Sequence, residues 1–74
     1  LVRSSNGRVV VDLRKPSQHA TTVRIRGVDG TLLHSVVVPA GQVRKEIAGV
    51  YGIVAIEVVQ QDRLVHASLA YLPL

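Results

Sequence analysis

The sequence contains no cysteine, methionine, tryptophan or phenylalanine. Without cysteine, no disulfide can staple the fold and no thiolate can bind a metal. Of its three histidines, His34 and His66 could approach each other if they lie on adjacent strands. Two ligands are fewer than the four that a closed metal site usually has. Its two tyrosines do not provide the aromatic platforms on which nucleic-acid bases stack. We therefore expect no metal site, no cofactor and no nucleic-acid partner.

The sequence also lacks the patterns of a membrane span, a signal peptide and a nucleophilic active site. No apolar run approaches the ~18 residues of a transmembrane helix, and no charged start precedes an apolar stretch. There is no Gly-x-Ser-x-Gly motif, and so small a domain leaves little room for a water-excluding cleft. We expect a protein without catalytic residues. Because the chain begins with Leu1 and has no methionine, we expect residues 1–74 to be a single domain excised from a longer protein.

Aliphatic residues dominate what is present. Hydrophobic residues make up 47% of the chain, and most of them are valine, leucine, isoleucine and alanine. β-Branched side chains favour the pleated, half-buried surface of a sheet. Nine lysines and arginines against five acidic residues give a formal charge of +4, which suits an anionic partner or serves solubility alone.

The most specific local signal lies in residues 22–38, where two β-branched runs flank Asp29-Gly30. An Asp-Gly pair can place both central residues of a two-residue hairpin turn at positive φ, so we expect a tight hairpin here. In its first strand Val23 and Ile25 alternate with Arg24 and Arg26. This alternation predicts a sheet with one dry face and one cationic face.

Further alternating runs predict the remaining strands, and turn residues separate them. An Asn6-Gly7 turn predicts a first hairpin, and Lys45 indicates a charged edge strand. The segment 53–59 is apolar on both faces apart from Glu57, as expected of a strand in the middle of a sheet. The other predicted strands are 8–13, 42–47 and 64–71. The fold class is therefore all-β, a small immunoglobulin-like antiparallel β-sandwich of about seven strands.

Arginines on one strand face form the candidate binding site. Arg24 and Arg26 share that face, and Arg44 would join them if its strand lies nearby. A pair of guanidinium groups can bind phosphate or carboxylate through parallel hydrogen bonds. The alternative interpretation is a solvated outer face, where charges contribute little.

A second candidate surface consists of apolar residues opposite the expected core positions. If no other layer covers them, they form an interaction surface or a route to a strand-exchanged homodimer. A register error of one residue would explain them equally well. These residues are Val10, Leu33, Val37, Ile53, Ala55 and Val59.

Three segments, taken in order, carry a family resemblance. The first is Arg-Val-Val-Val at 8–11 after an Asn-Gly turn, and the second is the strand, Asp29-Gly30 turn and returning strand of 23–33. The third is Gly-Ile-Val-Ala-Ile-Glu-Val at 52–58, with a last strand following at the end of the chain. The pattern resembles the C-terminal sorting domains of the type IX secretion system of Bacteroidetes. Its motif positions are Asp29, Gly30, Gly52, Val54, Ile56 and Val58.

The resemblance implies a sorting signal at the C-terminus of a larger exported protein. Such domains are recognised by the outer-membrane translocon and direct cargo from the periplasm to the outer-membrane surface or the medium. A sortase then removes the domain and attaches the cargo to anionic lipopolysaccharide, although some members, including subunits of the attachment machinery, retain it. Two alternatives stay open: an immunoglobulin-like accessory domain for adhesion or domain packing, and a small module that binds an anion such as lipopolysaccharide.

Overall fold

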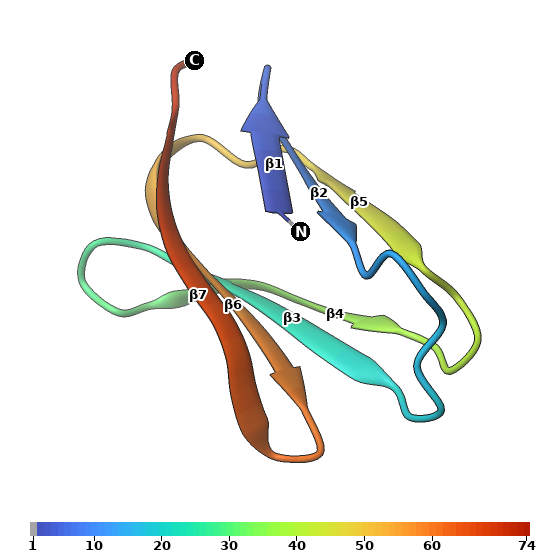
Figure 1. Cartoon of the computed structure of the whole chain (residues 1–74). Helices are drawn as coiled ribbons and strands as arrows, with labels where there is room; N and C mark the ends of the chain where they lie inside the picture. The colour runs from blue at the N-terminus through green and yellow to red at the C-terminus, as the bar shows by residue number, and fades with distance from the viewer. Residues whose placement is uncertain (1) are drawn as a thin grey trace.

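The computed structural model describes residues 2–74, which form seven antiparallel strands and no helix. Figure 1 shows their course from the blue N-terminal strand to the red C-terminal strand. The number of strands and the all-β class confirm the sequence prediction. The strands are β1 (Val2–Ser5), β2 (Arg8–Asp12), β3 (Thr21–Arg26), β4 (Leu32–Val38), β5 (Arg44–Ala48), β6 (Gly52–Gln60) and β7 (Arg63–Leu72).

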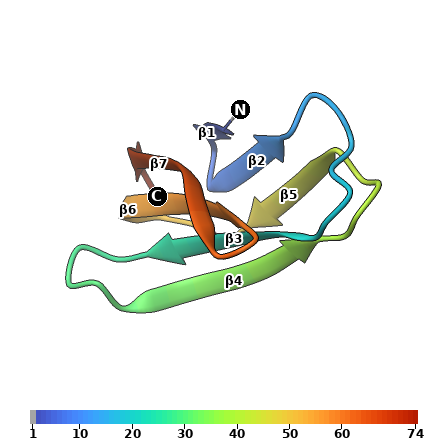
Figure 2. The same ribbon diagram turned by 60° about the horizontal axis from the view of Figure 1, so that its bottom comes forward.

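The strands build two sheets that face each other. One sheet has the order β1-β2-β5 and the other the order β4-β3-β6-β7. Figure 2 shows β2 and β5 above the layer that contains β3 and β4. Non-consecutive strands pair in both sheets, as in immunoglobulin-like sandwiches. As predicted, β5 with Lys45 lies at an edge and β6 lies inside its sheet.

Alternate residues of the strands fill the space between the sheets. The core is aliphatic, so its stability depends on close packing of branched side chains instead of aromatic rings. Val23 and Ile25 point inward while Arg24 and Arg26 point outward, which confirms the predicted alternation. The buried hydrophobic residues are Val9, Val11, Val23, Ile25, Val38, Ile47, Val50, Val54, Ile56, Val58 and Leu72.

The hairpin between β3 and β4 forms where it was predicted, but its turn differs. Only Gly30 has positive φ, at 86°, so the expectation that Asp29 shares this conformation is wrong. Gly27 donates its amide to the Thr31 carbonyl at 2.9 Å, and Gly30 donates to Gly27 at 3.0 Å. The loop therefore has three residues, 28–30, and the strand register shifts next to it. Such a loop needs positive φ at its last position alone.

The side chain of Asp29 explains why this wider loop is stable. The Thr31 amide donates a hydrogen bond to Asp29 Oδ1 at 2.9 Å, an Asx-type turn. The two other hairpins have two-residue turns with both residues at positive φ: Asn6 and Gly7 at 51° and 72°, Gln61 and Asp62 at 49° and 61°. The tight geometry expected of Asp-Gly thus occurs at Asn-Gly, and also at a pair without glycine.

The hydrogen bond at Asp29 makes the loop sensitive to acid. The Thr31 amide holds the pKa of Asp29 below its ordinary value of 3.8 because it stabilises the carboxylate. A carboxyl group with a lowered folded-state pKa contributes stability above its unfolded pKa, and that contribution is lost as pH falls through the folded pKa. In an NMR titration, the Thr31 amide shift of the wild type should follow a midpoint below 3.8.

The matched variant is Asp29→Asn, which keeps a side-chain oxygen as acceptor but has no carboxyl proton to gain. Its Thr31 amide shift should stay flat through the same acidic range. A wild-type midpoint at or above 3.8 would contradict the assigned hydrogen bond.

Candidate functional site

The structure separates the three arginines of the predicted site. Arg24 and Arg26 lie on the outer face of β3, in the four-stranded sheet. Arg44 lies on β5, in the other sheet, where it pairs in register with Asp12. The condition under which Arg44 would join the site, that its strand lies near β3, is not met. The candidate site on this face therefore contains two arginines.

Acidic side chains lie beside both arginines. Arg26 donates from Nε to Glu57 Oε1 at 3.0 Å and from Nη1 to the Gly30 carbonyl at 3.3 Å. Arg24 stands opposite Glu57 in the strand register and lines a shallow hollow of about 230 Å³ together with Glu57 and Asp62. Two carboxylates thus accompany the two guanidinium groups, so this arrangement favours a neutral partner surface over a polyanion.

Beside these charges lies an exposed apolar surface on β6 and β7. Ile53 is 57% exposed, Leu69 81% and Tyr71 69%. In the strand register Ile53 pairs with Tyr71 and Ala55 with Leu69, so the four residues are neighbours on one face. We call Ile53, Ala55, Leu69 and Tyr71 the outer apolar patch. Its single aromatic ring and branched side chains can dock against another apolar surface.

The predicted second surface agrees in part with this patch. The inward faces of β2, β3 and β6 are those expected from the sequence, and register shifts that were not expected occur between Ile25 and Arg26 and between Val58 and Val59. Leu33, Val37 and Ile53 are half-exposed. Val10, Ala55 and Val59 are partly buried. None of the six belongs to the buried core.

Sequence reasoning missed Leu69 and Tyr71 because β7 reverses the usual pattern. His66, Ser68 and Ala70 share a side with buried Leu72, whereas Leu69 and Tyr71 are exposed. An alternation of apolar with polar residues ordinarily places the apolar set inside. The sequence signal that could have indicated these two residues is the segment 53–59, which is apolar on both faces. Apolar residues on the outer face of one strand pair with apolar residues on the same face of its neighbour, here Ile53 with Tyr71 and Ala55 with Leu69.

The family motif positions are structural in this fold. Gly52 begins β6 with φ of 88°, a conformation that side chains disfavour. Val54, Ile56 and Val58 are 1%, 1% and 3% exposed, so they belong to the core and are not available to a partner. Asp29 and Gly30 lie in the loop between β3 and β4 and are exposed.

The histidines do not come together. His34 lies on β4 and His66 on β7, the opposite edges of the four-stranded sheet, so they are not on adjacent strands. Within residues 2–74 no group of three or more His, Cys, Asp or Glu side chains is placed to hold a metal ion. His66 Nε2 and Ser68 Oγ are hydrogen-bond partners at 3.1 Å. No helix able to cross a membrane occurs in this part of the chain.

Comparison with known proteins adds no relative to this description. No family model, curated protein or solved structure matches the chain. We therefore base the functional proposal on the fold, on the exposed surfaces and on the resemblance described above.

Proposed function

We propose that this chain is a C-terminal sorting domain of the type IX secretion system, recognised by protein components of the export machinery and without catalytic residues of its own. The outer apolar patch is the observation that carries the proposal. The resemblance supports it, since its three segments correspond to β2, to the β3–β4 hairpin and to β6 followed by β7.

The chemistry of the patch suits a protein partner. Burying an exposed leucine or isoleucine side chain contributes about 1.5–3 kcal/mol, and tyrosine is enriched among the residues that dominate interface energies. The neighbouring Arg26 and Glu57 already bind each other, so docking beside them strips water from a neutral pair instead of an isolated charge. The translocon and the sortase are the proposed partners, and the route runs from the periplasm to the cell surface.

The alternative of an accessory domain uses the same patch. An immunoglobulin-like domain for adhesion or domain packing would also dock an apolar sheet face, but it would not redirect an unrelated protein. The anion-binding alternative has less support because Glu57 and Asp62 accompany Arg24 and Arg26. These alternatives predict different behaviour for a fusion protein.

The test fuses residues 1–74 to the C-terminus of a periplasmic reporter in a strain with a working type IX system. We expect the reporter at the cell surface or in the medium, measured by protease accessibility and fractionation. In a matched strain without the translocon, the same fusion should stay in the periplasm. Equal periplasmic retention in both strains would contradict the proposal.

A further inference from the structure

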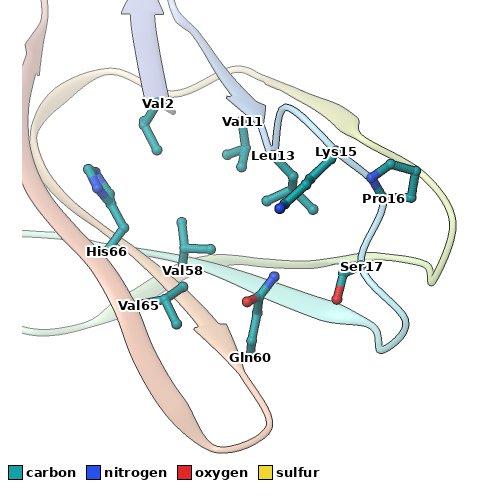
Figure 3. Close-up of a pocket in the computed structure, with 10 residues that line it drawn as sticks. All are labelled: Val2, Val11, Leu13, Lys15, Pro16, Ser17, Val58, Gln60, Val65 and His66. Carbon is teal, nitrogen blue, oxygen red and sulfur yellow. The ribbon is translucent and has the colours of Figure 1, made fainter.

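A cleft of about 420 Å³ opens between the two sheets on the side of β1 and β7. Figure 3 shows its lining, with Val2, Val11 and Leu13 across from Val58 and Val65. Val11 and Val58 are 1% and 3% exposed, whereas Val65 is 53% exposed. The volume lies in the range of roughly 300–1,000 Å³ that is usual for ligand sites. The cleft thus has an aliphatic part with an accessible valine, and the side chains of Lys15, Ser17, Gln60 and His66 complete its wall.

Two edge strands, β1 and β7, flank the cleft. β1 has four residues and pairs with β2 from Val2, opposite Val11, whereas β7 has ten residues. Leu13 follows the end of β2 and donates its amide to Val43 on the side away from β1. Leu13 thus lines the cleft next to the part of the chain that pairs with β5.

The edge of β7 is protected only in part against a further strand, by Arg63 at its start, by the register shift at Val58 and Val59 and by Pro73 after its end. Among the described strands β7 pairs with β6 alone, and no charged side chain occurs from Leu64 to Leu74. Natural edge strands are ordinarily guarded by lysine, proline or short length. β4, at the other edge of this sheet, is also uncharged but lies away from the cleft. The edge of β7 thus lies beside a cleft whose lining is partly aliphatic.

Cations rim the same cleft. Lys15 lines it, and Figure 3 shows its amino group directed toward the other lining residues. Lys15 forms no ion pair with a described residue. An adjoining hollow of about 470 Å³ shares Val2 and His66 with the cleft. This hollow adds two arginines and one carboxylate, those of Arg3, Arg14 and Asp12.

Local geometry fixes the position of this cationic rim. Arg14 has a positive φ of 67° and donates its amide to Asp12 Oδ1 at 2.8 Å. Positive φ is uncommon for a residue with a side chain, and the hydrogen bond to Asp12 compensates part of its cost. The chain is thereby turned so that Lys15 and Pro16 line the cleft.

We propose that the cleft binds an extended peptide segment of a protein partner, which adds a strand to the free edge of β7. Alternate side chains of such a strand, about 7 Å apart, point to one side, so two aliphatic side chains enter the cavity together. An acidic residue of the segment binds Lys15. A peptide is favoured over a small molecule because a peptide also gains backbone hydrogen bonds along the edge of β7. This inference does not depend on the sorting function.

The test uses a fluorescent octapeptide with valine at alternate positions and a C-terminal glutamate, with anisotropy as the readout. We expect it to bind, and a version with a central proline to bind at least about tenfold more weakly, since proline cannot complete the strand pairing. Lys15→Gln should weaken binding about two- to fivefold, while the matched Arg44→Gln leaves it unchanged. Hydrogen exchange should slow at edge amides of β7.

Two variants on the same strand locate the site. Val65→Asp places a charge at the cleft mouth and should reduce peptide affinity about tenfold or more. Leu69→Asp makes the same chemical change at an exposed position of the outer apolar patch and should leave peptide affinity unchanged. Both positions are exposed, at 53% and 81%, so both variants should fold. An export defect of Leu69→Asp with normal peptide binding would separate the two proposals.

Four results would overturn the inference. One is equal binding of the alternating and proline-containing peptides, and another is an equal loss of affinity in both aspartate variants. A third is dimerisation in sedimentation experiments that Val65→Asp abolishes and the peptide does not inhibit, which would assign the cleft to a second copy of the chain. The fourth is binding of octanoate without binding of any peptide, which would indicate a small amphiphile.

Discussion

Ile56→Ala is expected to lower the free energy of unfolding by about 2–5 kcal/mol, the usual cost of truncating a buried aliphatic side chain. Ile56 is 1% exposed and lies in β6 between Ile25 of β3 and Ser68 of β7. A domain of this size has a total stability of about 4–11 kcal/mol, so this single change removes a large part of it. Urea unfolding followed by circular dichroism measures the difference.

Ile53→Ala is the matched control on the same strand. Ile53 is 57% exposed on the outer face, so its truncation should change the free energy of unfolding by less than about 0.5 kcal/mol. The comparison tests the strand register, because a shift of one residue would exchange the two positions. A larger loss from Ile53→Ala than from Ile56→Ala would contradict the fold.

Gly7→Ala is expected to be the most destabilising of the simple glycine substitutions. Gly7 has φ of 72° in the turn between β1 and β2, which costs a residue with a side chain about 1–2 kcal/mol. A Cβ atom at Gly7 would also lie 2.6 Å from Cε1 and Cζ of Tyr51. The tyrosine ring must therefore move, which adds a packing cost of about 1–3 kcal/mol.

Gly49→Ala separates these two contributions. Gly49 has nearly the same φ, 74°, but an added Cβ would meet nothing within 4 Å. Gly49→Ala should therefore show the backbone cost alone, and the double variant Gly7→Ala, Tyr51→Ala should regain most of the packing term relative to Tyr51→Ala. Thermal unfolding of the four variants provides the comparison. Equal destabilisation by Gly7→Ala and Gly49→Ala would show that the ring contact contributes nothing.

The strands were predictable because period-two patterns are strong where one face is buried. Val23 and Ile25 alternate with arginines, and Val9 and Val11 flank Val10, so each strand indicates its own inner face. The three-residue loop at Asp29 was not predictable from the Asp-Gly pair. Its geometry depends on hydrogen bonds of Gly27 and Thr31, which lie outside that dipeptide.

The candidate binding site was less predictable than the fold because it depends on contacts between strands. A sequence shows that Arg24 and Arg26 share a face, but it does not show that Glu57 binds Arg26 across the β3–β6 pair. It likewise leaves open that β5 joins the other sheet, which separates Arg44 from both. The cleft is lined by residues from both sheets that are far apart along the chain, so it has no local sequence signal.

The central claim is that export machinery recognises the outer apolar patch. The most direct measurement is the surface fraction of a reporter fused to the wild-type domain, to Leu69→Asp or to Val65→Asp in a strain with a working type IX system. Leu69→Asp should reduce the surface fraction at least about tenfold, because it places a charge in the outer apolar patch, the proposed docking surface. Val65→Asp should export like the wild type. Equal export of all three fusions, or equal loss in both variants, would contradict the claim.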